Sequence, residues 1–192
     1  MKERIEQYAH ESIQTKKKFF DSQTDKLIEA ANILIEAIQR GEKILLIGNG
    51  GSAADAQHIA AELVNRLTYD RPPIAAIALT TDSSILTSVG NDASFAELFE
   101  RQVKALGRPG DVLIAISTSG NSPNVIRAVH AAKNIKMKVI AFAGRNGGTL
   151  APLADCALVV EADNTQHIQE THITIGHILC ELVQEAVFPN PD

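Results

Sequence analysis

Two short segments of this chain have the residue types of anion-binding loops. They are Gly48-Asn49-Gly50-Gly51-Ser52 and Ser117-Thr118-Ser119-Gly120-Asn121-Ser122. Each follows an apolar run and precedes a segment with helical periodicity. A strand that ends in such a loop and continues into a helix presents free backbone N–H groups and the positive end of the helix dipole. Both segments are therefore candidate sites for a phosphate group or another anion.

The first loop has glycines where a ligand would need close access to the backbone. We expect Gly50 and Gly51 to adopt positive φ angles, and Ser52 to be the N-cap of the following helix, with Asp55 at the capping-box position. A tight, capped turn without any ligand explains this loop equally well when it is taken alone.

The stretch 48–53 also fits the G-x-G-x-x-A pattern of dinucleotide-binding folds. In such folds an acidic residue at the end of the second strand binds the cofactor ribose, about 20 residues beyond the loop. Here the second apolar run, 74–79, is followed by two threonines, and its first acid, Asp82, comes about ten residues too late. The pattern therefore disfavours an NAD-dependent oxidoreductase.

The second loop offers four hydroxyl groups, those of Ser117, Thr118, Ser119 and Ser122. Pro123 follows at the expected first helical position, where its missing N–H costs nothing. Hydroxyls and free amides suit a phosphate monoester, and the absence of a Walker-type lysine disfavours a nucleoside triphosphatase. The alternative is a hydroxyl-rich turn that only caps its helix.

His58 and Glu62 are spaced i, i+4 on the helix that leaves the first loop. This spacing puts both side chains on one helical face, one turn apart, where they could bind a metal ion or act as an acid–base pair. An exposed polar face is the alternative.

The last helical segment, 166–187, carries Gln169 and His177 among apolar residues. Eight residues correspond to about 12 Å along a helix, which is too long for both side chains of one straight helix to reach one ion. Either the helix bends near Gly176, or the two residues serve a site from different subunits, and we favour an inter-subunit site. His172 could support that site or be an ordinary core histidine.

Asn91 and Asp92 lie in an expected loop after Ser88-Val89-Gly90. Small polar side chains there could bind sugar hydroxyls, or could equally cap a helix.

The elements needed to position these residues alternate along the chain. Strands are predicted at 43–48, 74–79, 111–117, 137–143 and 156–161, and helices at 52–66, 94–106, 123–134 and 166–187. Residues 1–40 are predicted to form a helical hairpin broken around 21–24 and closed by Gly41. Continuous apolar strands alternating with helices predict an α/β, doubly wound, mainly five-stranded parallel sheet with helices on both faces. We expect the tail, 189–192, to fray.

Composition narrows the functional classes. The 192 residues carry a net charge of −5 with no basic stripe, and the Lys16-Lys17-Lys18 cluster fits a solvated helix face, so no direct nucleic-acid partner is expected. Cys156 and Cys180 lie in apolar settings without metal-site spacing, which indicates reduced core thiols. No run reaches the roughly 20 apolar residues of a membrane span, so we expect no membrane partner and a cytoplasmic location.

These motifs together resemble the sugar-isomerase (SIS) domain of the phosphoheptose isomerase family. The resemblance rests on 48–58 followed by Glu62, on Gly90-Asn91-Asp92, on 117–122, on Gly144-Arg145-Asn146-Gly147-Gly148, and on 168–172 with His177. The matching segments occur in order through essentially the whole chain.

The resemblance implies a single structural unit in which 1–40 serves oligomerisation and 41–192 is the SIS sugar-phosphate-binding domain. It implies a cytoplasmic homotetramer with sites between subunits. It also implies isomerisation of sedoheptulose 7-phosphate to D-glycero-D-manno-heptose 7-phosphate through an enediol(ate), towards the heptose of bacterial lipopolysaccharide.

Site roles follow from the resemblance residue by residue. The sugar phosphate would be bound by Asn49, Gly50, Gly51, Ser52, Glu62, Asn91, Asp92, Ser117, Thr118, Ser119, Ser122 and Gln169, with the loop hydroxyls on the phosphate. Glu62 would be the base and His177 the acid. One Zn²⁺ per subunit would be bound by His58, Glu62, Gln169 and His177. Because a metal-bound carboxylate and imidazole are not free to move protons, the role of the metal stays open at this point.

The two ends of the chain also resemble a non-catalytic SIS-domain scaffold that binds the DNA-replication initiator. That relative lacks the glutamate corresponding to Glu62 and has an altered hydroxyl loop. This chain has Glu62 and the whole 117–122 run, which favours an enzyme.

Overall fold

Five parallel strands form the central sheet of the protein. The computed structural model describes residues 1–189 and places the strands in the order β2-β1-β3-β4-β5. Their bounds are β1 Ile44–Ile47, β2 Ala76–Ala78, β3 Val112–Ser117, β4 Lys138–Gly144 and β5 Cys156–Val160. All four strand pairs are parallel, so the predicted sheet is confirmed.

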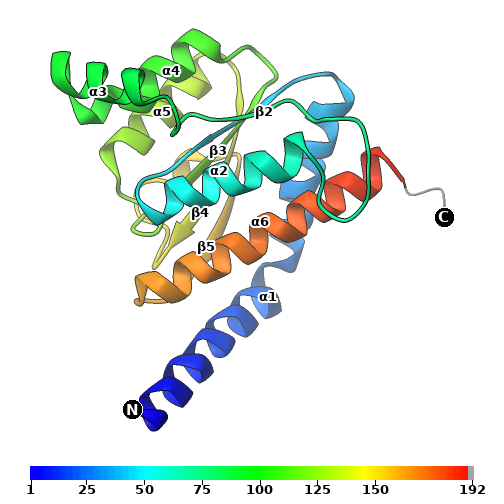
Figure 1. Cartoon of the computed structure of the whole chain (residues 1–192), viewed down its shortest axis with the longest axis vertical. Coiled ribbons are helices and arrows are strands. Elements are labelled where there is room, and N and C mark those ends of the chain that lie inside the picture. Colours follow the sequence, from blue (N-terminus) through cyan, green and yellow to red (C-terminus); the bar gives the residue numbers. More distant parts are fainter. Residues whose placement is uncertain (190–192) are drawn as a thin grey trace.

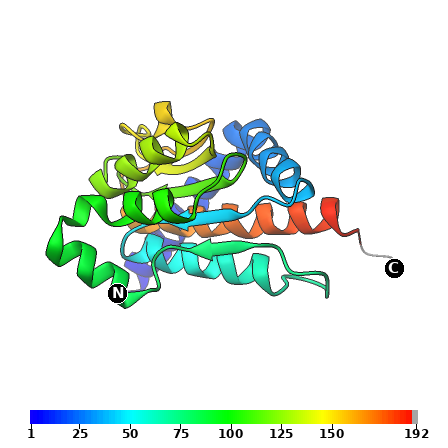
Figure 2. The same cartoon turned by 90° about the horizontal axis from the view of Figure 1, so that it is seen from above.

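Helices cover both faces of this sheet (Figures 1 and 2). One face packs against α1 (Lys2–Gln39), α2 (Gly51–Val64) and α6 (Thr165–Val187). The other face packs against α4 (Leu98–Leu106) and α5 (Pro123–Asn134), with α3 (Ser83–Asp92) beside α4. Two short 3₁₀ helices, Phe95–Glu97 and Ala151–Leu153, complete the structure.

Each central strand contributes to two hydrophobic cores. In β1 and β3, Leu46 and Ile114 face the core shared with α1, α2 and α6, whereas Leu45 and Leu113 face the core shared with α4 and α5. Because successive strand side chains point to opposite faces, a sheet covered on both sides requires apolar residues at every position. This requirement explains the unbroken apolar runs in the sequence.

The N-terminal segment is one continuous helix, and the predicted hairpin is wrong. The residues expected to break it instead suit a helix: Lys17 pairs with Asp21, and the hydroxyls of Ser22 and Thr24 donate to backbone carbonyls four residues earlier. Gly41 ends the helix with a φ of 76°, as predicted. Residues 1–18 are exposed or half-buried, and this part of α1 extends beyond the sheet in Figure 1.

The segment between β2 and α4 also differs from the prediction. Residues 83–92 form a helix because the Asp82 carboxylate caps it by accepting from the Ile85 N–H. Asn91 and Asp92 therefore lie in its last turn and not in a loop. The predicted helix 94–106 divides into a 3₁₀ turn and α4. The use of Asp82 as a cap further disfavours the dinucleotide hypothesis.

The remaining predicted helices and the cysteines agree with the structure. Helices α2, α5 and α6 begin and end within two residues of the predicted bounds. Cys156 and Cys180 are free and buried, and burial raises the pKa of their thiols to about 11 and about 12. No helix within residues 1–189 is long and apolar enough to cross a membrane. Of the tail expected to fray, 190–192 lie outside the described residues.

The topology places the two candidate loops side by side. Strands β1 and β3 are neighbours, with Ile47 paired to Ala115. The chain leaves β1 through α2 on one face and leaves β3 through α5 on the other. In open α/β sheets, ligands bind at the carboxyl ends of the strands where such a switch occurs.

Candidate active site

The first loop turns tightly into α2. Gly50 is the N-cap with a φ of 55°, and its carbonyl accepts from the N–H groups of Ala53 and Ala54. The prediction of a positive φ at Gly50 is confirmed. The prediction that Ser52 is the N-cap is wrong, because the helix already begins at Gly51 and Ser52 is buried in its first turn.

Gly51 is needed for a different reason from the one expected. Its φ is not positive, but a Cβ at this position would lie 2.2 Å from Nε2 and 2.5 Å from Oε1 of Gln169. The amide of Gln169, which comes from the first turns of α6, therefore lies directly against the backbone of the first loop. Glycine is the residue that leaves room for it.

Asp55 lies beside this contact. It is buried, and its Oδ2 has no hydrogen-bond partner among residues 1–189. Burial raises the pKa of its carboxyl to about 6, and the nearby Gln169 amide and the charge of His58 oppose this rise only in part. Asp55 and Gln169 line a cavity of about 340 Å³ that also includes Tyr8 of α1.

The second loop gathers its hydroxyl groups. Ser117 Oγ is 3.0 Å from Ser122 Oγ and 3.4 Å from Ser119 Oγ, and the Asn121 N–H donates to Ser119 Oγ. Pro123 occupies the first position of α5, as predicted, with Ser122 as the N-cap. The loop hydroxyls therefore lie at the positive end of a helix, as an anion site requires.

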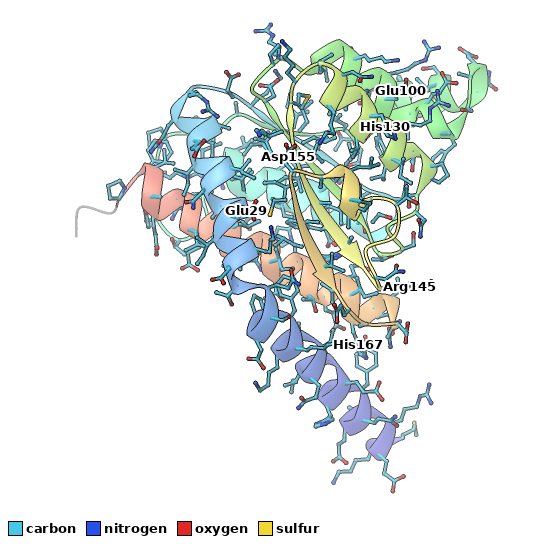
Figure 3. The ribbon with its side chains drawn as sticks, turned by 180° about the vertical axis from the view of Figure 1, so that it is seen from behind. Glu29, Glu100, His130, Arg145, Asp155 and His167 are labelled. Carbon is cyan, nitrogen blue, oxygen red and sulfur yellow. The ribbon has the colours of Figure 1, made fainter. Side chains whose placement is uncertain are left out.

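The segment after β4 holds the second loop in place. The carbonyl of Gly120 accepts from the Leu150 N–H, and the Asn121 side-chain oxygen accepts from the N–H and the hydroxyl of Thr149. Arg145 has a left-handed φ of 58° and lines a cavity of about 610 Å³ with Ser119. Figure 3 shows Arg145 at the end of β4, near the beginning of α6. Asn121 and Arg145 have no predicted role of their own, although both lie inside motifs that carry the family resemblance.

A second contact, which the sequence does not predict, links the first loop directly to the first turn of α5. Asn49 of the first loop and Asn124 of α5 exchange a pair of hydrogen bonds of 2.9 and 2.8 Å between their side-chain amides. Nothing in the local sequence signals this pair, because its members are 75 residues apart and lie on different elements.

Three of the four predicted acid–base and metal residues form one cluster. His58 Nε2 lies 3.2 Å from Glu62 Oε1 and 3.5 Å from His177 Nε2, and a ligand atom from each residue lies within 4.8 Å of the other two. The two imidazole rings meet edge to face, with centroids 5.0 Å apart. His177 reaches His58 because α2 and α6 run side by side (Figure 2).

The donor set and the spacing of this cluster suit a metal ion. Two imidazoles and a carboxylate are the protein ligands of one class of zinc site. Around a tetrahedral ion with metal–ligand bonds of about 2.1 Å, neighbouring ligand atoms lie about 3.4 Å apart, close to the two distances measured from His58 Nε2. The cluster can therefore accept a metal ion without large rearrangement.

Gln169 does not join this cluster within one chain. Helix α6 runs without interruption from Thr165 to Val187. Along it, the Gln169 side chain lies against Gly51, whereas the His177 side chain lies beside His58. Gly176 serves close helix packing, since a Cβ there would lie 2.6 Å from Ile59 Cδ1 of α2. The structure thus gives no support to the predicted alternative of a bend near Gly176.

His172 is a core histidine. It is completely buried, and its Nε2 donates to the carbonyl oxygen of Ala143 at 3.1 Å. Burial lowers the pKa of its imidazole to about 4, so the ring is neutral at physiological pH.

Asn91 and Asp92 stay on the outside of the molecule. Both are exposed, and their side chains bond to each other at 2.7 Å. Helix α3 nevertheless borders the first loop, because Leu86 lines a small apolar cavity of about 160 Å³ together with Asn49 and Gly50.

Comparison with known proteins identifies the family of this chain. Residues 7–144 match the SIS domain family. Phosphoheptose isomerase from Aquifex aeolicus is 53% identical over 187 residues, covering 97% of this chain and 98% of that protein. The solved phosphoheptose isomerase from Neisseria gonorrhoeae has a TM-score of 0.91 and 45% identity, covering 96% of this chain and 98% of that one. That from Francisella tularensis has a TM-score of 0.92 and 39% identity, covering 95% and 97%. The chain therefore belongs to the phosphoheptose isomerase family of SIS-domain proteins.

Proposed function

We propose that this protein converts sedoheptulose 7-phosphate into D-glycero-D-manno-heptose 7-phosphate. Family membership supports this activity, because the relatives named above are phosphoheptose isomerases. The structural observation that carries the proposal is the meeting of two anion-binding loops at the switch between β1 and β3, with a paired carboxylate and imidazole on the adjoining helices.

The second loop binds the phosphate in this proposal. The hydroxyls of Ser117, Ser119 and Ser122 converge at the N-terminus of α5, and Thr118 completes the set. Hydroxyl and backbone donors at a helix N-terminus bind a phosphate dianion without a neighbouring lysine. The first loop and the last turn of α3, with Asn91 and Asp92, would then contact the sugar.

Glu62 and His177 carry out the proton transfers. Glu62 removes a proton from C1 of the ketose and returns it to C2, while His177 donates a proton to the carbonyl oxygen on C2. As the aldehyde forms, the hydroxyl proton on O1 passes to His177 and restores the acid, so the reaction has no net change in protons. Both side chains are half-buried in the same cluster, which supports the proposal that they act on one substrate.

His58, Glu62 and His177, together with Gln169, would bind a zinc ion. A bound Zn²⁺ would polarise the substrate carbonyl and stabilise the charge on the enediolate oxygen. Glu62 and His177 must both be free of the metal while they move protons, so we propose that substrate replaces them as ligands.

The site is proposed to form between subunits of a homotetramer. Glu62 lies eleven residues from Gly51, about 16 Å along α2, so the proton-transfer pair of one chain is about three helical turns from its own loops. Sites shared between chains would bring the pair of one subunit to the loops of another. The exposed apolar side chains Ile5, Ile13 and Ile28 along α1 are suited to subunit contacts.

We place this activity in the cytoplasm, in the biosynthesis of lipopolysaccharide heptose. The scaffold alternative has no support from the comparisons, and the intact Glu62 cluster argues against it.

The deciding experiment is turnover of sedoheptulose 7-phosphate by the purified chain, as isolated, after chelation, and with zinc restored. We expect formation of the aldose, lost on chelation and recovered with zinc. A folded oligomer that binds the sugar phosphate but never turns it over would refute the isomerase.

A further inference from the structure

The amide pair between Asn49 and Asn124 is a direct side-chain link between the first loop and the first turn of α5, which follows the second loop. Asn49 Nδ2 donates to Asn124 Oδ1 at 2.9 Å, and Asn124 Nδ2 donates to Asn49 Oδ1 at 2.8 Å. Asn124 is 2% exposed, and Asn49 is half-buried. The pair therefore crosses the switch between β1 and β3, where the ligand is proposed to bind.

The orientation of this pair is determined by the backbone of α5. Asn124 Oδ1 also accepts from the Val125 N–H at 3.0 Å, which identifies the oxygen and leaves Nδ2 to donate. Asn49 must then present its own oxygen to that Nδ2 and its own Nδ2 to the oxygen. An amide at both positions offers a donor and an acceptor to each partner.

The pair uses half of the hydrogen-bonding capacity of the Asn49 amide. One of its two donors and one of the two lone pairs of its oxygen are used inside the protein, so we expect the first loop to contact substrate mainly through its backbone. The side chain instead joins the turn at Gly50 to the first turn of α5, two residues after Ser122.

We propose that Asn124 is a positioning residue that couples the sugar-binding loop to the phosphate-binding loop. The inference rests on the proposed function, in which residues 117–122 bind the phosphate. A ligand phosphate on the second loop orders the start of α5, and the amide pair transmits that order to the first loop. The coupling must also operate in reverse, because linkage between two sites is reciprocal.

This reciprocity gives a test that does not require turnover. Inorganic phosphate binds the second loop alone, and its dissociation constant can be measured by calorimetry on the full-length protein. We expect Asn49→Ala, although it lies in the other loop, to weaken phosphate binding by about three- to tenfold. Asn124→Ala should weaken phosphate binding by a similar factor. The double variant should bind phosphate as well as the weaker-binding single variant does, within twofold.

The control is Asn134→Ala, an exposed asparagine at the other end of α5. It should leave phosphate affinity unchanged, which separates the coupling from general effects on that helix. If Asn124→Ala fails to fold, Asn49→Ala alone still decides the question. Phosphate affinity within twofold of wild type in Asn49→Ala, or effects that multiply in the double variant, would overturn the coupling. Failure of the unmodified protein to bind phosphate would instead refute the assignment of the second loop.

Discussion

His177 places its Nε2 atom 3.5 Å from Nε2 of His58, although the two residues are 119 positions apart. Gly176 makes this approach possible, since any larger residue there would collide with Ile59 and separate α2 from α6. With Glu62 Oε1 3.2 Å from the same nitrogen, three of the four predicted metal ligands come from one chain. The fourth, Gln169, lies two turns earlier on α6, against Gly51.

Removing one imidazole of this cluster should remove the metal. We expect His58→Ala and His177→Ala to lose most of their zinc on dialysis, because the site is then left with three of its four ligands, one of which is the neutral amide of Gln169. His130→Ala is the matched control, since His130 is exposed on α5 (Figure 3), on the opposite face of the sheet. Metal content measured by mass spectrometry checks this, and a His58→Ala variant with full zinc content would contradict the assignment.

The proton acceptor is tested by Glu62→Gln. The substitution keeps the shape but removes the base, so kcat should fall by more than tenfold while sugar-phosphate affinity stays within about tenfold. Glu181→Gln, an exposed glutamate on α6, should leave kcat unchanged. Steady-state kinetics and calorimetry separate the two effects. A Glu62→Gln variant that retains more than a tenth of the wild-type kcat would exclude Glu62 as the base.

Mixing two inactive variants tests whether sites are shared between subunits. If Glu62 and Gln169 reach a site from different chains, Glu62→Gln and Gln169→Ala subunits combined in equal amounts should recover about a quarter of wild-type activity. Each two-fold interface between subunits would hold two sites. Half of these interfaces then contain one subunit of each variant, and in each of them one of the two sites is intact. Turnover should be measured after co-expression and compared with each variant alone. No recovery would show that both residues act within one chain.

The space at Gly51 can be filled without disturbing the backbone. A Cβ there would displace the Gln169 amide, which is the end of a flexible side chain, so Gly51→Ala should change the free energy of unfolding by less than about 1 kcal/mol. Turnover should nevertheless fall at least tenfold, and Gln169→Ala should cause little further loss in that background.

Gly90→Ala provides the comparison for that experiment. A Cβ there meets no atom within 4 Å among the described residues, and Gly90 lies inside α3 without a positive φ. It should raise stability by about 0.5–1 kcal/mol, as expected for alanine in a helix interior. Unchanged turnover in Gly51→Ala would show that the Gln169 amide has no role in the reaction.

His172 should make stability depend on pH. Its folded-state pKa of about 4 lies below the ordinary value of 6.5, so the unfolded chain binds the proton first as the pH falls. The stabilisation that depends on the neutral His172 ring is therefore complete above pH 6.5 and is lost between pH 6.5 and 4. The free energy of unfolding should fall by up to about 3 kcal/mol over this range.

Urea unfolding at pH 7, 5.5 and 4.5, at one protein concentration, measures this loss. His172→Gln keeps a donor for the Ala143 carbonyl but cannot titrate, so its stability should fall less over the same range. Equal pH dependence in the two proteins would show that other groups cause the loss.

Local patterns predicted most of the fold because their physical causes are local. The apolar runs at 43–48 and 111–117 are strands buried on both faces, and the i, i+4 spacing of His58 and Glu62 does place them 3.2 Å apart. The break expected at 21–24 was wrong, because Ser22 and Thr24 bond back to their own helix and do not interrupt it. The helix at 83–92 is not among the predicted elements, because its start depends on the cap that the Asp82 carboxylate provides.

The sequence by itself determined the residue types, the two loops and the order of the elements, since these follow from periodicity and turn chemistry. Only the tertiary structure decided which distant residues meet. The parallel order of β1 and β3 brings Asn49 to Asn124, and the packing of α2 on α6 brings His177 to His58 and Gln169 to Gly51. Such contacts depend on how whole elements pack around two cores, and no spacing along the chain encodes them.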